Sequence, residues 1–311
     1  MAFLSELRYP TTRLAKLLSG ILAVVLFVLV AISAVSGFLL YQVLHPSRAA
    51  ATFDLSVMMG HPVSFSFPVQ NGASRDGWFF PGLRSAPTVI VCHGYHSQRA
   101  EVLTLVTALQ DQQFNVFLFD FTGHGTSAGV SSLGYRETGE VQSAIQALAT
   151  RDDVDPTRFG LWGTDMGGYA AIEVATGDHR VAAFIVDDAY IDPRDMLQIE
   201  LNRSGLTVLP GVGKFSDFAF RIVNYQFRDQ PPVTSLLART KGIPKLFFAS
   251  DDRPALAAET TNLFMHSPDP KQLVHDRLSY AEMPDDDRKN YESQVVSFFL
   301  LNLSPTSRPN H

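Results

Sequence analysis

A strand-turn-helix segment at residues 159–169 constrains the fold of this chain most strongly. Its apolar start indicates a buried strand, and the glycines that follow indicate a sharp turn before a helix. Asp165 stands at the centre of the turn, with Gly163 and Gly167 two residues away on either side. Only such small neighbours let a strand and a helix approach closely while the central residue is held in a strained turn. The segment therefore predicts a side chain presented above the edge of a sheet.

Strands and helices alternate through the rest of the domain. Continuous apolar runs, typical of parallel strands covered on both faces, occur at 88–92 and 116–119, and further strands are expected at 158–162, 181–186 and 245–249. Helical patterns occur at about 98–112 and 136–150, after Gly167, and at 290–301, while 63–67 and 78–80 predict an antiparallel strand pair. This order predicts an α/β fold with a doubly wound, mainly parallel sheet. The interval from about 191 to 241 breaks the rhythm with an amphipathic piece at Phe215–Phe227, and we interpret it as a helical cap.

The N-terminal part of the chain carries a long apolar segment. No charged residue occurs from Leu17 to Leu44, which exceeds the roughly 20 residues that a spanning helix needs. Three basic residues precede it against one acidic residue (Arg8, Arg13, Lys16 and Glu6), so we expect a cytoplasmic N-terminus and an extracytoplasmic domain. A cleavable signal peptide is the alternative, because small residues follow at 49–51. We therefore expect the chain to associate with the cell membrane through this segment.

These features divide the chain into five parts. They are a cytoplasmic N-terminus (1–16), a transmembrane helix (17–44), a linker (45–60), the α/β domain (61–303) and a short tail (304–311). The net charge of −6 argues against a nucleic-acid partner, because no basic stripe is present. The single cysteine, Cys92, excludes an intramolecular disulfide framework.

The central turn resembles the nucleophile elbow of the α/β-hydrolase family, and three further segments resemble that family in the same order. His93-Gly94-Tyr95 is similar to its oxyanion loop, so the resemblance implies that the backbone N–H groups of Tyr95 and Met166 stabilise negative charge. The run 120–127 is similar to the structural turn after the next strand. The run 247–254 is similar to the acid-bearing loop, which places Asp252 at the triad-acid position and Asp251 as the alternative.

Two departures from the family pattern bear on activity. Asp165 stands where the resemblance implies a nucleophilic serine, and the loop at 279–287, where it implies the catalytic histidine, contains none. The nearest histidines, His275 and His266, do not fit the expected register, and His96 is a further candidate base. We interpret His93 and His124 as structural, hydrogen-bonded residues. An aspartate can itself attack carbon, as in the haloalkane dehalogenase and epoxide hydrolase branches of the fold, but hydrolysis of the resulting ester needs a general base.

A carboxylate at a helix N-terminus is stabilised by the backbone N–H groups it faces, so Asp165 could fill its own oxyanion hole. We expect no cofactor and no metal, although acids clustered at the strand ends, including Asp187 and Asp188, could attract a cation. The resulting hypothesis is a membrane-anchored, hydrolase-like binding or scaffold protein with a degenerate triad. The alternatives are an active hydrolase of ester, amide or carbon-halogen bonds that uses Asp165 as nucleophile, and a structural subunit of a larger membrane complex.

Overall fold

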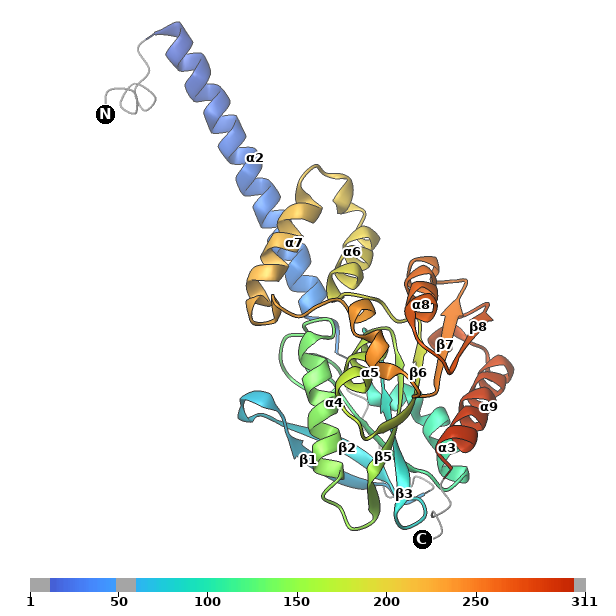
Figure 1. The fold of residues 1–311 in the computed structure, drawn as a ribbon. Coiled ribbons are helices and arrows are strands. Elements are labelled where there is room, and N and C mark those ends of the chain that lie inside the picture. Colours follow the sequence, from blue (N-terminus) through green and yellow to red (C-terminus); the bar gives the residue numbers. More distant parts are fainter. Residues whose placement is uncertain (1–11, 49–59, 305–311) are drawn as a thin grey trace. The chain divides into compact units, whose positions relative to one another are not determined.

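The structure, a computed structural model, describes residues 12–48 and 60–304 (Figure 1). Most of the predicted N-terminal part (1–16), linker (45–60) and tail (304–311) lies outside the described residues. The described residues form two compact units. One comprises residues up to 43 together with 197–228, and the other comprises 44–196 and 229 onward.

The second unit is built from strands connected by helices. The strands are β1 (Val63–Pro68), β2 (Ser74–Phe80), β3 (Ala86–Cys92), β4 (Asn115–Phe119), β5 (Val154–Thr164), β6 (Val181–Asp187), β7 (Lys245–Ser250) and β8 (Lys271–Asp276). The helices are α3 (Leu103–Asp111), α4 (Tyr135–Leu148), α5 (Asp165–Gly177), α8 (Pro254–His266) and α9 (Asp285–Asn302). Helix α6 (Pro193–Arg203) leads from this unit into the other.

The strands form one eight-stranded sheet in the order β1-β2-β4-β3-β5-β6-β7-β8. Strand β2 pairs antiparallel with both β1 and β4, and all the other pairs are parallel. The prediction of a mainly parallel sheet and of an antiparallel pair formed by β1 and β2 is confirmed, while the antiparallel pairing of β2 with β4 is additional. Because neighbouring parallel strands end at the same edge, the register that pairs Cys92 with Gly163 and Thr164 with Asp187 brings the residues that follow β3, β5 and β6 to one edge.

Helices cover both faces of this sheet. Helices α3 and α9 contact each other on one face. On the other face α4 contacts α5, α5 contacts β5 and β6, and α8 contacts β7 (Figure 1). The core on the α3 and α9 face includes Trp162 of β5 and Tyr291 of α9, whose hydroxyl accepts a hydrogen bond from the Trp162 indole at 3.0 Å. The apolar runs that predicted β3 and β4 are fully buried, as expected for strands that helices cover on both faces.

Two predicted helices have different limits in the structure. The last helix begins at Asp285 rather than near residue 290, because three aspartates in its first turn favour the positive end of the helix dipole and Pro284 precedes them. The helix predicted over 98–112 is divided into a 3-10 turn at Arg99–Val102 and α3. Both differences concern helix ends, where local capping decides the boundary.

The first unit contains helix α2 (Arg13–Leu44) and helix α7 (Val212–Val223). Helix α2 is long and apolar enough to cross a membrane, and its most apolar part is not buried by the rest of the described chain; a signal sequence has the same properties. Helix α7 packs against α2, since the Ser36 hydroxyl donates to the Val212 carbonyl at 3.1 Å and the Ser216 hydroxyl donates to the Ser36 carbonyl at 3.4 Å. Residues between β6 and β7 are thus largely helical.

Candidate functional site

Asp165 occupies a sharp turn between β5 and α5. Its backbone has a φ of +37°, a conformation that non-glycine residues rarely adopt. The flanking glycines are required by space: a Cβ at Gly163 would overlap the carbonyl of Gly167, and a Cβ at Gly167 would overlap the carbonyl of Cys92. The side chain of Asp165 is only 3% exposed. The strained, crowded turn that the glycine spacing predicted is therefore present.

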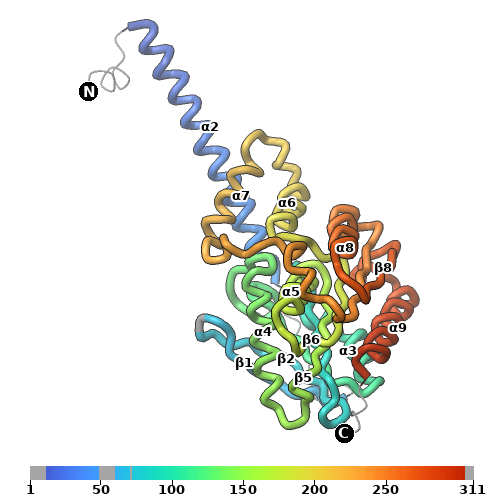
Figure 2. The backbone as a smooth tube through the Cα atoms, viewed as in Figure 1, coloured from blue at the N-terminus to red at the C-terminus, as the bar shows by residue number. Residues whose placement is uncertain are grey.

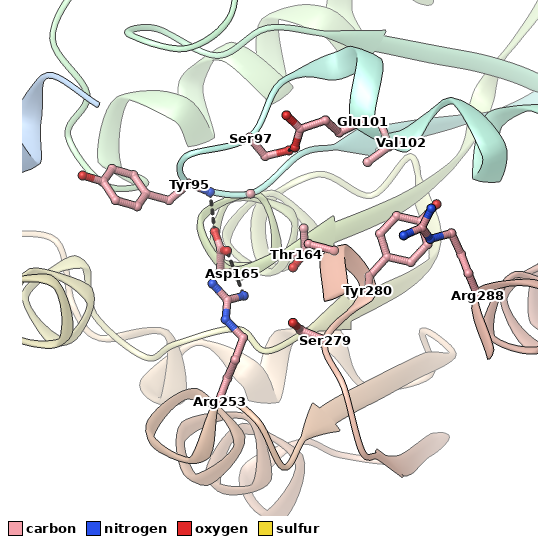
Figure 3. A pocket seen from close by; sticks show the side chains of 12 residues that line it. Tyr95, Ser97, Glu101, Val102, Thr164, Asp165, Arg253, Ser279, Tyr280 and Arg288 are labelled. Carbon is pink, nitrogen blue, oxygen red and sulfur yellow. Dashed lines mark hydrogen bonds and ion pairs between the residues drawn. The ribbon is translucent and has the colours of Figure 1, made fainter. Parts of the chain in front are cut away.

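The carboxylate of Asp165 has three partners in the described part of the chain, and Figure 3 shows two of them, Tyr95 and Arg253. The backbone N–H of Tyr95 donates to Oδ1 at 2.6 Å, and the N–H of Met166 donates to the same oxygen. The Arg253 guanidinium forms an ion pair with Oδ2 at 3.2 Å. The structure thus brings together three of the four predicted site residues, Asp165, Tyr95 and Met166. The two backbone N–H groups converge on one oxygen, the geometry of a site that binds negative charge.

Arg253 is the site residue that the sequence interpretation missed. Burial of its guanidinium acts to lower its pKa, but the carboxylates of Asp165 and Asp188 outweigh that effect, so its pKa is raised. A buried carboxylate without a partner of opposite charge is costly, which is a signal that some cation had to approach Asp165. The sequence offers no means of choosing Arg253, which is 88 residues away, from among the other basic residues.

The fourth predicted residue, Asp252, is engaged elsewhere. Its carboxylate accepts hydrogen bonds from the backbone N–H of Ser279 at 2.8 Å and from the Ser279 hydroxyl at 2.9 Å. Ser279 belongs to the connection between β8 and α9, in which the family resemblance implies the histidine. Asp252 thus holds the expected loop, with a serine in place of an imidazole. The alternative acid, Asp251, is exposed.

The histidines occupy other positions. His93 is buried, and its Nε2 accepts a hydrogen bond from the Phe121 N–H at 3.1 Å while its Nδ1 lies 2.8 Å from the Gly94 carbonyl. Burial and the nearby His124 lower the pKa of His93 to about 4, so it is a neutral residue that joins two loops. His275 lies in β8 and is exposed, and His266 ends α8. His96 is exposed and packs against the Tyr95 ring, with centroids 4.1 Å apart.

A second acidic pair ends the neighbouring strand. Asp187 is fully buried and accepts a hydrogen bond from the Tyr291 hydroxyl at 3.1 Å, and burial together with the adjacent Asp188 raises its pKa well above the usual range. Asp188 accepts the Ser250 N–H at 2.9 Å, and burial raises its pKa to about 6 although the Ser250 bond and Arg253 oppose the shift. Among the described residues no group of three or more histidine, cysteine, aspartate or glutamate side chains could hold a metal ion.

A cavity of about 390 Å³ opens beside Asp165. Figure 3 shows that Arg253 and Ser279 line it on one side, Ser97 and Glu101 on another, and that Arg288 and the Tyr280 ring lie next to each other at its far end. The volume falls within the range of small-molecule sites. Its charged lining consists of two arginines and two carboxylates, and Val102, Ala281 and the Tyr280 ring add apolar surface.

Comparisons with known proteins agree with this architecture. The sequence is similar to the uncharacterized protein YfhR of Escherichia coli, with 27% identity over 252 residues, 78% of this chain and 82% of that protein. It is also 33% identical over 111 residues to an uncharacterized protein of Mycobacterium tuberculosis, which is 34% of this chain and 38% of that one. The fold resembles that of the esterase Pf2001 of Pyrococcus furiosus, with a TM-score of 0.65 and 18% identity over 85% of this chain and 99% of that one.

The α/β hydrolase GrgF of Penicillium superposes with a TM-score of 0.61 and 17% identity over 78% of this chain and 99% of that one. At these identities the likeness concerns the fold alone. The sequence model of the alpha/beta hydrolase family matches residues 89–301, which include the elbow, the Tyr95 loop, the Asp252 loop and all but the last residue of α9. This chain therefore belongs to the alpha/beta hydrolase family.

Proposed function

We propose that this protein is a membrane-anchored α/β-hydrolase homologue that binds a ligand or partner without hydrolysing it. Helix α2 is the anchor, the N-terminus lies in the cytoplasm and the α/β domain lies on the extracytoplasmic side. The observation that carries the non-catalytic part is the occupation of the charge-binding site by Asp165 itself. Both N–H donors, from Tyr95 and Met166, are used by a carboxylate that belongs to the chain.

The internal carboxylate acts against catalysis in two ways. Acyl transfer needs these N–H groups free to bind the oxyanion that develops in the transition state, and here a negative oxygen already occupies them. The nucleophile position is also neutralised, because Arg253 pairs with the other carboxylate oxygen and reduces its tendency to attack. A cavity of 390 Å³ still opens beside these residues, so ligand binding is retained in this proposal.

The rival function is hydrolysis with Asp165 as the nucleophile. This function is supported by the difference between the two carboxylate oxygens. Oδ1 accepts both backbone N–H groups, whereas Oδ2 has one partner, Arg253 at 3.2 Å, and both residues line the cavity. Attack by Oδ2 would form an ester whose breakdown requires a base to activate water. None of the three partners of the carboxylate is a histidine, and Ser279 occupies the loop where the family resemblance implies one.

Covalent trapping separates the two functions. The purified full-length protein is incubated with activated ester and epoxide probes, and its intact mass is measured beside that of Asp165→Asn. We expect no adduct that depends on Asp165. An adduct that forms on the wild-type chain, is absent from Asp165→Asn and turns over with time would refute the binding function and support the hydrolase.

Rebuilding a triad tests the role given to the lost residues. Asp165→Ser alone supplies a hydroxyl but no base, so we expect ester hydrolysis to stay near the buffer rate. Adding Ser279→His to that variant puts an imidazole beside Asp252, and we expect a measurable rise over the single variant. Robust esterase activity of Asp165→Ser alone would show that another group serves as base and that the triad is less degenerate than proposed.

A further inference from the structure

Helix α7 carries an apolar stripe that is exposed in the described part of the chain. Three faces can be separated by the helical period of 100° per residue. The buried face, which packs on α2, consists of residues spaced by four (Val212, Ser216 and Phe220). The exposed apolar face has the spacing i, i+3, i+7 (Phe215, Phe218 and Ile222), and the polar face has the same spacing one residue earlier (Lys214, Asp217 and Arg221).

The connection that leads into α7 is also apolar and exposed. Leu206, Val208 and Leu209 lie there, and Val208 is 81% exposed. Single exposed apolar side chains need no explanation, but a stripe on a helix that continues into an apolar connection marks an interaction surface. We name this surface, made of Leu206, Val208, Leu209, Phe215, Phe218 and Ile222, the apolar rim.

The position along α2 at which α7 makes its contact indicates what covers the apolar rim. Lys16 is the last charged residue before the uncharged run, and Ser36, the contact of α7, follows it by 20 residues. At a rise of 1.5 Å per residue this separation is about 30 Å, the thickness of the hydrocarbon core of a bilayer. If Lys16 lies at one boundary of the bilayer, the contact with α7 lies at the other.

The apolar connection lies on the lipid side of that contact. Ile32 of α2, one turn nearer the N-terminus than Ser36, faces Gly211: a Cβ placed on Gly211 would lie 3.6 Å from its Cγ2. Figure 2 shows the α6–α7 connection directed along α2 toward its N-terminal half, and α7 crossing α2 instead of running along it. A helix that crosses the spanning helix at this level extends along the membrane plane, the orientation of interfacial amphipathic helices.

From these observations we propose that the apolar rim inserts into the outer boundary of the bilayer, so that α7 is an interfacial membrane helix beside the anchor α2. The lipid acyl chains are the occupant of the rim, and the apolar side chains of α2 that precede Ser36 are largely exposed as well. Lys214 and Arg221, on the polar face, are suited to the level of the lipid phosphates. This inference rests on the membrane anchoring proposed for α2.

Depth-dependent quenching in the full-length protein tests the rim. Single tryptophans are introduced in vesicles of phosphatidylcholine with brominated acyl chains, where bromine quenches indoles at hydrocarbon depth. Ile222→Trp probes the rim, and its neighbour Arg221→Trp is the matched control, because both residues are exposed but belong to different faces of the helix. The two native tryptophans are 5% exposed or less and contribute a constant background.

A third variant, Leu26→Trp in the middle of α2, reports on the anchor alone. We expect strong quenching at Leu26→Trp, and a loss of emission at Ile222→Trp about twofold or more greater than that at Arg221→Trp. Equal quenching of Ile222→Trp and Arg221→Trp with Leu26→Trp quenched would overturn the interfacial helix and leave the anchor intact. No quenching at Leu26→Trp would refute the anchor, and the inference with it.

Discussion

Asp165 and Asp188 are the same residue type at equivalent positions of neighbouring strands, yet their surroundings differ. Each directly follows a paired strand end, since Thr164 of β5 is in register with Asp187 of β6. Each has positive φ, +37° and +49°. Asp165 receives two backbone N–H groups and Arg253, whereas Asp188 receives one N–H group from Ser250 and its second oxygen has no hydrogen-bond partner among the described residues.

The difference shows how the fold supports one buried carboxylate and only tolerates the other. The N-terminus of α5 and the Tyr95 loop compensate Asp165 with donors that the fold provides for negative charge. Asp188 has less compensation, and burial raises its pKa to about 6. Arg253 lies within electrostatic reach of both, so the two aspartates share one cation.

Removing the shared cation is the largest expected perturbation of this pair. Arg253→Met leaves Asp165 and Asp188 buried without a positive partner, and we expect a loss of about 3 kcal/mol in the free energy of unfolding at pH 7.5. Urea denaturation measures it. Arg194→Met, which breaks the half-exposed pair with Asp192, is the matched control and should cost less than about 1 kcal/mol. Similar losses in both variants would show that Asp165 does not depend on Arg253.

Crowding around Asp165 gives the next largest effect. A Cβ at Gly94 would lie 2.6 Å from the Asp165 Oδ2, so Gly94→Ala should destabilise the protein by about 2 kcal/mol. The shorter side chain in Asp165→Ser should suppress most of that cost. Gly177→Ala, where an added Cβ meets nothing within 4 Å, is the control and should be neutral or slightly stabilising in thermal unfolding. An equal cost of Gly94→Ala with and without Asp165 would mean that the carboxylate is not the neighbour that matters.

The second carboxylate of the comparison predicts a pH dependence of stability. The pKa of Asp188 is about 6 in the folded protein against an ordinary 3.8, so between these values the folded state binds more protons than the unfolded state. Stability from this group therefore rises as pH falls from 7.5 to 5, by about 1 kcal/mol. Asp188→Asn lacks the effect and tolerates the positive φ. Its stability relative to wild type should fall by that amount on acidification; a constant difference across this range would contradict the raised pKa.

The sequence predicted most of the scaffold around these two residues. Strands β3, β4 and β7 are buried along their whole length and are largely apolar because helices cover both of their faces. The elbow is evident from Gly163 and Gly167, where an added Cβ would overlap backbone atoms. Strand β8 is not among the strands that the sequence located, because it is an edge strand with a mixed, half-exposed sequence. The periodic spacing of apolar residues and the residue types at turns are local properties of the sequence, and they predict local structure well.

The site itself was only partly predictable. The approach of Tyr95 and Met166 to Asp165 follows from the order of motifs, because parallel strands end at one edge. The pairing with Arg253 and the bonds from Ser279 to Asp252 depend on the reach and rotamers of side chains 88 and 27 residues apart. No spacing rule fixes such contacts. The different degree of compensation of Asp165 and Asp188 likewise depends on which donors face each carboxylate in three dimensions.

The smallest expected effect tests whether the two carboxylates influence each other. The charge of Asp165 contributes to the raised pKa of Asp188, and Arg253 opposes it. Asp165→Asn removes the first influence and releases Arg253 from its ion pair, so both changes should lower the pKa of Asp188 below about 6. Carboxyl ¹³C shifts followed by NMR titration measure this, and Asp251→Asn, which alters an exposed and screened charge, is the control. If Asp188 titrates at the same pH in all three proteins, the two strand ends are electrostatically independent, and Arg253 serves Asp165 alone.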